Sequence, residues 1–465
     1  MSAAAMRRMV AVGLMAVVGV CCGASAQDLT VKAPPQSRAV VIRGATLHPV
    51  SAAPIENGVI MLSGGKIEGL YSEQQFAEME KVASWAAPGP LFVDGKGKHV
   101  YPGMVAAYTQ LGLDEIAAVE AGRDFNEAGE YSPEVRVIAA VNADSNNLTV
   151  TRSNGVLAAG VFPLGGTMPG QPAVIKLEGW TWEEMAVSPS IGSVIEWPAM
   201  RPVQSFFVRT PEAEQRKRTR QQIDTIDAMF RAAKTYVAAK SADPSTPTDL
   251  RYEALRACVE GDPKARKPVF ITANDVDQIN AAVAWAAEHE LRCVIVGGYD
   301  APLCSELLKK HDIPVILQGT LRFPKRDDSD YNQTFALPSK LKELGVRFCI
   351  SSGEETPHER NTPYAAGMAI AHGLSADDAI RAVTLSAAEI LGVADHLGSL
   401  EKGKDATVIV TTGSPLEITT QIVDAFVDGK RIDLSNKQTK LYEKYKERYR
   451  QMGELKNEVK PAAQP

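Results

Sequence analysis

Short apolar runs alternate with amphipathic segments through the second half of the chain. Residues 268–272 have the pattern of a strand, residues 274–289 place their apolar side chains on one helical face, and residues 293–298 form the next strand pattern. Asn274 is placed to cap the helix. Repeated strand–helix–strand units predict a parallel sheet, and an open sheet and a closed barrel both fit this periodicity. The repeat continues through residues 303–310, 313–318, 337–344 and 347–351.

A different pattern stands at both ends of this region. Residues 39–70 contain short alternating runs separated by glycines, which predicts hairpins in a small antiparallel sheet. Further strand patterns occupy residues 398–410 and 424–432, and residues 442–456 have the periodicity of a last helix. The chain therefore predicts an α/β protein with a large central domain and a smaller β-structure.

The N-terminal 26 residues differ in composition from the rest of the chain. Arg7 and Arg8 precede an apolar run over residues 9–20, and small residues stand just before Gln27. This order is typical of a signal peptide cleaved after Ala26, and the apolar run is too short for a permanent membrane span. We therefore expect a periplasmic or secreted protein without a stable membrane span.

Charge and cysteine content exclude some functions. Loss of two arginines with the leader moves the formal net charge from −6 to −8, and no basic face for a phosphate backbone stands out, so nucleic acid is not expected as a partner. The basic cluster within residues 209–240 is flanked by acids, which favours a solvated helix face over a docking site for an anionic partner. Cys293 and Cys349 lie inside predicted strands, whereas a pairing of Cys258 with Cys304 stays open.

Two motifs carry a family resemblance. Residues 100–113, VYPGMVAAYTQLGL, resemble the first barrel strand of amidohydrolases, in which Pro-Gly and two hydrophobic residues precede Asp-x-His-x-His. Residues 398–410, GSLEKGKDATVIV, are similar to the segment that begins the family's C-terminal strands. Residues 124–185 and 349–406 resemble the exported imidazolonepropionase-like members. The resemblance implies a TIM-like (β/α)8 barrel, a small β-sandwich built from N- and C-terminal segments, and hydrolysis of C–N bonds other than peptide bonds.

The resemblance also implies domain boundaries. Two expectations concern single features. The last helix should cover the sandwich or the floor of the barrel, and the Lys176 side chain should lie at the protein surface or at the rim of the barrel. The expected segments are a signal peptide over residues 1–26, the N-terminal half of the sandwich over 38–100, the barrel over 101–395, the C-terminal half of the sandwich over 396–435, and a C-terminal helix and tail over 436–465.

The family's metal ligands are replaced in this sequence. Tyr108 and Gln110 stand where the resemblance places two histidines, Thr272 stands at a third ligand position, and Gly297 precedes Gly298 where another histidine is often found. The seven histidines include no pair at i,i+2 or i,i+4, the spacing from which zinc sites usually start. The sequence therefore predicts no metal, no other cofactor and no metal-dependent hydrolysis.

Polar residues at the predicted strand ends remain candidates for a pocket. The family's catalytic aspartate falls near residues 353–355, and we prefer Glu355 over Glu354 as a catalytic acid or base. The predicted pocket residues are Tyr108, Gln110, Thr272, Asn274, Glu354 and Arg360. Four uses are open for them: an abandoned cavity, binding of a small polar ligand, a subunit of an oligomer or of a pair with an intact related amidohydrolase, and a metal-free hydrolase in which Tyr108 assists Glu355.

Overall fold

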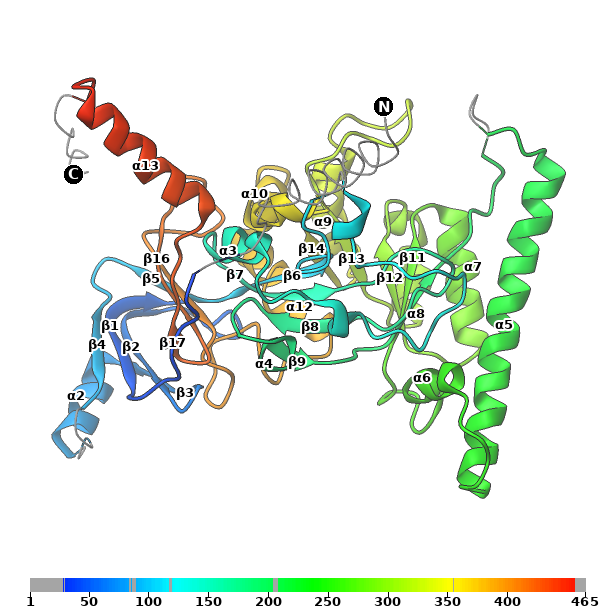
Figure 1. The fold of residues 1–465 in the computed structure, drawn as a ribbon, viewed down its shortest axis with the longest axis horizontal. Coiled ribbons are helices and arrows are strands. Elements are labelled where there is room, and N and C mark those ends of the chain that lie inside the picture. The colour runs from blue at the N-terminus through cyan, green and yellow to red at the C-terminus, as the bar shows by residue number, and fades with distance from the viewer. Residues whose placement is uncertain are drawn as a thin grey trace, which may run out of the picture.

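The computed structural model describes residues 28, 30–82, 85, 89–116, 119–203, 208–353 and 355–455. The predicted signal peptide and Glu354 lie outside these residues, so nothing tests them here. Within this part of the chain, helices and strands are mixed, as Figure 1 shows, and no helix is long and apolar enough to cross a membrane. The predicted mixed α/β fold is confirmed at this level.

Five strands form a fully parallel sheet in the order β10-β11-β12-β13-β14. The helix between β11 and β12 begins with a capping box in which Asp275, and not Asn274 as predicted, accepts a hydrogen bond from the Gln278 amide. The strands are β10 (Ser193–Glu196), β11 (Val269–Ala273), β12 (Cys293–Gly297), β13 (Val315–Gln318) and β14 (Phe348–Ser351).

A second sheet of four strands, in the order β6-β7-β8-β9, lies against both edges of the first. Ser351 Oγ donates a hydrogen bond to the Tyr108 carbonyl over 2.8 Å, which joins β14 to β6. At the other edge the Val194 amide donates to the Gly170 carbonyl over 3.0 Å. The two sheets share a core of buried apolar side chains that includes Val105 and Phe270. The strands are β6 (Met104–Thr109), β7 (Val156–Val161), β8 (Ala173–Lys176) and β9 (Ala186–Ser188).

Helices surround these sheets. The 31-residue helix α5 lies along one end of the molecule in Figure 1, far from the third sheet, which the two ends of the chain build. On α5, Arg216 pairs with Glu212 and Arg218 with Glu214 one turn earlier, and all four side chains are exposed. The helices are α2 (Glu73–Val82), α3 (Asn146–Arg152), α4 (Trp182–Met185), α5 (Glu212–Ala242), α6 (Leu250–Val259), α7 (Val276–Glu288), α8 (Ser305–Lys310), α9 (Gln333–Glu343), α10 (Thr362–Ala371), α11 (Ala376–Ala382), α12 (Leu385–Ile390) and α13 (Lys437–Gln451), with short 3-10 turns η1 (Glu120–Gly122), η2 (Val137–Ala140), η3 (Ala301–Cys304) and η4 (Thr356–Asn361).

The third sheet combines strands from both ends of the chain. Its order is β17-β16-β15-β5-β1-β2-β3, and β4 pairs with the free part of β1. The pairing of β5 with β15 therefore joins the N-terminal and C-terminal segments directly. A two-layer sandwich stays a prediction. The strands are β1 (Val40–Leu47), β2 (Ile55–Ser63), β3 (Lys66–Ser72), β4 (Leu91–Asp94), β5 (His99–Pro102), β15 (Val408–Thr411), β16 (Ile422–Val427) and β17 (Lys430–Arg431).

Lys176 ties the central strands to the third sheet. Its Nζ lies 2.6 Å from Asp405 Oδ2 and 2.5 Å from Asp428 Oδ1. Burial opposes ionisation of Asp405, but hydrogen bonds and charge from Lys176 and Lys66 hold its pKa below the usual value. The prediction of a surface or rim position for Lys176 is wrong, because the side chain is buried beneath two carboxylates 229 and 252 residues away in the sequence.

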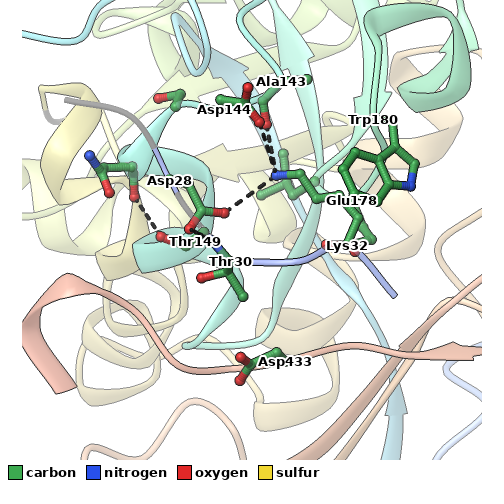
Figure 2. Close-up of polar contacts among 12 residues, drawn as sticks. Asp28, Thr30, Lys32, Ala143, Asp144, Thr149, Glu178, Trp180 and Asp433 are labelled. Atoms are coloured by element: carbon green, nitrogen blue, oxygen red, sulfur yellow. Dashed lines mark hydrogen bonds and ion pairs between the residues drawn. The ribbon is translucent and has the colours of Figure 1, made fainter. Parts of the chain in front are cut away.

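The N-terminal arm, defined as Asp28 with residues 30–39, packs against the central strands. Figure 2 shows Lys32 Nζ between Asp28 Oδ2, at 3.3 Å, and the Ala143 carbonyl, at 3.0 Å. The next residue, Ala33, donates its amide to Glu178 over 2.8 Å. Because Asp28, Lys32 and Glu178 are buried, these contacts fix the start of the arm to the body of the protein.

Two further expectations concern helix α13 and the pairing of two cysteines. Helix α13 begins and ends five residues earlier than the predicted range of 442–456, and none of its residues is buried, so the expectation that it covers the sandwich or the barrel floor is wrong. Asn436 anchors its start by donating to Ser153 Oγ over 3.0 Å, and the rest of the helix projects away from the body in Figure 1. Cys258 and Cys304 are both free thiols, which answers the open question about their pairing.

Candidate functional site

Three polar side chains meet at the carboxyl ends of β6, β10 and β11. Glu196 and Thr272 are paired in register on neighbouring parallel strands, so their side chains lie on the same face. Thr272 Oγ1 donates a hydrogen bond to Glu196 Oε1 over 3.0 Å, and the buried Tyr108 phenol lies close enough for the Glu196 charge to raise its pKa. We call Tyr108, Thr272 and Glu196 the polar relay.

Burial sets the protonation of the relay. It raises the pKa of Glu196, and the hydrogen bond from Thr272 partly opposes this shift. Burial also raises the pKa of Tyr108, and the neighbouring Glu196 carboxylate raises it further. Tyr108 is therefore a neutral phenol at physiological pH, and burial shifts Glu196 towards its protonated form.

Apolar groups enclose the phenol. The Tyr108 ring lies 4.6 Å from the Phe162 ring, and Phe162 in turn makes an edge-on contact with Phe270 at 5.1 Å. Gln110 donates its side-chain amide to the Phe162 carbonyl over 3.4 Å. The two residues that replace the expected strand-β6 histidines are thus used in packing and in a backbone contact.

The relay opens at Glu196 into a cavity of about 420 Å³ between the loop after β7, the end of β10 and the first turns of α5. Thr167 Oγ1 lies 3.3 Å from Glu130 Oε2, and Gln222 Nε2 lies 3.4 Å from the same hydroxyl. The charged side chains of this cavity are Glu130, Glu196 and Arg218, and Arg218 already pairs with Glu214. The cavity, called the Glu196 cavity below, is therefore rich in hydrogen-bond acceptors.

Residues 191–433 match the sequence profile of the Amidohydrolase family. The chain belongs to the amidohydrolase family. It is 23% identical over 379 residues to the amidohydrolase tasK of Hapsidospora irregularis, a match that covers 75% of this chain and 38% of that protein. The chain thus spans under two fifths of the length of that curated relative.

Solved structures of amidohydrolases share the fold. An amidohydrolase from Thermotoga maritima MSB8 aligns with a TM-score of 0.71 at 23% identity, covering 84% of this chain and 99% of that one. Molinate hydrolase aligns with a TM-score of 0.52 at 14% identity, covering 87% and 96%. At these identities the comparison speaks for the fold alone.

The other predicted pocket residues lie outside the relay. Asn274 lines a separate cavity of about 60 Å³ at the ends of β12 and β13, together with Gln318. Arg360 donates to the Pro357 carbonyl over 3.3 Å. Glu355 is exposed at the start of η4, where its charge raises the pKa of Asp114 after the larger effect of burial. The structure thus brings Tyr108 and Thr272 together but not the whole set, and the functional roles stay predictions.

The residues present do not fit the metal that the family resemblance implies. Among the described residues, no group of three or more His, Cys, Asp or Glu side chains lies close enough to hold a metal ion. At the strand ends, the relay offers a neutral phenol, a hydroxyl and one carboxylate, whereas zinc needs three or four strong N, S or O ligands. The close histidine pair, His48 Nε2 and His99 Nδ1 at 3.0 Å, belongs to the third sheet.

Two acidic residues near the strand ends were not predicted from the sequence as site residues. Glu196 ends a four-residue apolar strand directly before Trp197-Pro198, and an acid at such a strand end is the signal that could have found it. Glu359 in η4 is 1% exposed and is hydrogen bonded to Ser352, Thr109 and Thr362, with Thr362 Oγ1 at 3.0 Å. Burial raises its pKa to about 7. Nothing in its local sequence separates it from exposed acids.

Proposed function

We propose that this amidohydrolase-family protein binds a small polar ligand in the Glu196 cavity without a divalent metal, and that metal-dependent hydrolysis has been lost. The observation that carries the proposal is the polar relay, in which the Thr272 hydroxyl donates to Glu196 and the neighbouring Tyr108 is a buried phenol. A catalytic zinc ion lowers the pKa of its bound water to about 7, and this relay offers no comparable activation of water.

The lining of the cavity supports a class of ligand. Glu130 and Glu196 supply carboxylate oxygens, and Thr167 and Gln222 add neutral polar groups. Glu130 is exposed and Glu196 is partly buried, and such acceptors are matched by ligand groups that donate hydrogen bonds. We infer a ligand with amide N–H or amine groups, small enough for about 420 Å³.

A metal-free hydrolase of C–N bonds is the second candidate, and the desolvated carboxylate of Glu196 favours it. In this reaction Glu196 would accept a proton from water that attacks the substrate carbonyl, and would pass that proton to the leaving nitrogen as the C–N bond breaks, while Thr272 holds the carboxyl group in position. The acid that the sequence suggested for this role, Glu355, is exposed.

Three further inferences complete the proposal. The links of β14 to β6 and of β10 to the Gly170 segment support closure of the two central sheets into one barrel. The pattern of the N-terminal 26 residues supports export to the periplasm or outside the cell. Assembly with itself or with a histidine-complete amidohydrolase remains a use of the fold that co-purification from native extracts would test.

Ligand binding gives the direct test. Isothermal titration of the full chain with small cyclic amides, such as hydantoin, and with primary amines should identify a ligand. Glu196→Gln should weaken its binding about tenfold or more, because a charge-assisted hydrogen bond is lost. Glu355→Gln, the matched control, should bind as the unmodified chain does. Prior treatment with EDTA should leave the affinity unchanged.

Opposite results decide against the proposal. Stoichiometric zinc, nickel or iron in the purified protein, together with loss of binding after EDTA, would show that a metal centre was retained. Turnover of a bound amide by the EDTA-treated chain, abolished in Glu196→Gln, would establish the second candidate instead.

A further inference from the structure

Helix α13 carries an aromatic stripe that no part of the described structure covers. Tyr442, Tyr445, Tyr449 and Met452 follow one another at spacings of three, four and three residues, which places them on one helical face. These side chains are 64%, 48%, 43% and 53% exposed, respectively. A stripe of four large side chains left in water on a single helix indicates a binding surface.

Charged residues are sorted around this stripe. On one border Lys446 Nζ lies 5.9 Å from the centre of the Tyr442 ring, and on the other Arg448 Cζ lies 5.8 Å from the Tyr449 ring. The acids Glu443 and Glu447 are one turn apart on the opposite face, which also carries Lys440 and Lys444, and Glu447 pairs with Arg450. The helix has six basic and two acidic residues, a net charge of +4, so the rest of the chain carries −10.

We infer that α13 docks the protein parallel to an anionic phospholipid surface, with the Tyr442–Met452 stripe in the headgroup layer. Lys446 and Arg448 on the two borders would then meet lipid phosphates, while the mixed-charge face that carries Glu443 and Glu447 points to water. Tyrosine suits this depth, since its ring is apolar and its hydroxyl needs a wet partner. This inference does not depend on the proposed ligand site.

The same pattern disfavours two other occupants. In a pair of α13 helices joined through the stripe, Lys446 and Arg448 of each copy would lie beside the seam, where like charges repel. An acidic protein surface could match the basic borders, but a dry interface would leave three tyrosine hydroxyls to be satisfied.

The position of α13 suits contact with a surface. The helix is fixed at its start by Asn436 and by Lys440, whose Nζ lies 2.9 Å from Thr30 Oγ1, and it then projects from the body in Figure 1. Charges are screened beyond about 8 Å at physiological salt. The projecting end of the helix can therefore approach an anionic surface ahead of the negatively charged body.

Vesicle co-sedimentation of the full chain tests the inference. Vesicles with one phosphatidylglycerol for every two phosphatidylcholines should bind the chain. Pure phosphatidylcholine vesicles should bind it with an affinity lower by about tenfold or more. Raising the salt to about 1 M, where the screening length is about 3 Å, should release the protein.

Two double variants test whether the stripe itself, and not the charge of the whole helix, binds the vesicles. Tyr445→Ser/Tyr449→Ser should weaken binding to the anionic vesicles about tenfold, because the apolar face is lost without a change in charge. Glu443→Gln/Glu447→Gln on the opposite face should bind several-fold more tightly. All four positions are exposed, and unchanged circular dichroism and melting would show that both variants fold.

Some results would overturn the inference. They are equal binding to neutral and anionic vesicles, full binding by the tyrosine variant, and absence of vesicle binding by the intact chain. A dimer in sedimentation analysis that the tyrosine variant converts to a monomer would assign the stripe to a second copy. Salt-sensitive capture of one acidic protein by the stripe, without vesicle binding, would assign it to that partner.

Discussion

Arg152→Leu should destabilise the protein by about 3–5 kcal/mol, the cost expected when one partner of a buried ion pair is removed. Arg152 is 1% exposed and Glu178 is 5% exposed, and their side chains form an ion pair between α3 and the residues after β8. Arg152 also donates to the Leu177 carbonyl over 3.3 Å. Without the guanidinium, the Glu178 carboxylate would stay buried and uncompensated, and its bond to the Ala33 amide would be weakened with it.

Urea unfolding at neutral pH would measure this loss. Adding Glu178→Gln to Arg152→Leu should restore most of the stability, since the amide oxygen still accepts from Ala33 and no charge remains buried. Arg450→Leu, which breaks the exposed pair with Glu447, is the matched surface control and should leave the midpoint nearly unchanged. If Arg152→Leu behaves like Arg450→Leu, the pair does not stabilise the attachment of the arm.

The regular parts of the fold could be predicted because local sequence patterns determine them. The apolar runs near residues 268–272, 293–298, 313–318 and 347–351 correspond to β11–β14, and the glycine-punctuated run near residues 39–70 corresponds to β1–β3. Strands of three or four residues are recognised from sequence when amphipathic helices flank them, as for β13 and β14, and β8, β9 and β10 follow one another without a long helix between them. For this reason β10 and the antiparallel pairing of β8 with β9 were not predicted.

Residues whose surroundings come from distant segments could not be placed. Lys176 looks like a rim lysine in its own strand, and its carboxylate partners arrive only when the C-terminal strands fold. The apolar periodicity of α13 indicates a packed helix equally well whether the partner is within the chain or outside it. At the candidate site, the sequence alone showed that the expected histidines are replaced. The contact between Thr272 and Glu196 could not be predicted, because it depends on the register of β10 with β11.

Glu359→Gln should remove most of a pH dependence of stability between about pH 4.5 and pH 7. Burial raises the pKa of Glu359 from 4.5 to about 7, so the folded chain keeps a proton that the unfolded chain releases in this range. Stability from this group is therefore fully present below about pH 4.5 and is lost as the pH rises through about 7, a loss of about 3 kcal/mol.

The glutamine cannot ionise, and its size and shape let it keep contacts with Ser352, Thr109 and Thr362. Relative to the unmodified chain, the variant should therefore gain up to about 3 kcal/mol between pH 4.5 and pH 8, measured as the difference in urea unfolding free energy. Glu355→Gln, four residues earlier and exposed, should follow the pH profile of the unmodified chain. If the two variants keep parallel profiles, Glu359 ionises as an ordinary carboxyl group, and the closed packing of η4 against β6 and β14 does not hold its proton.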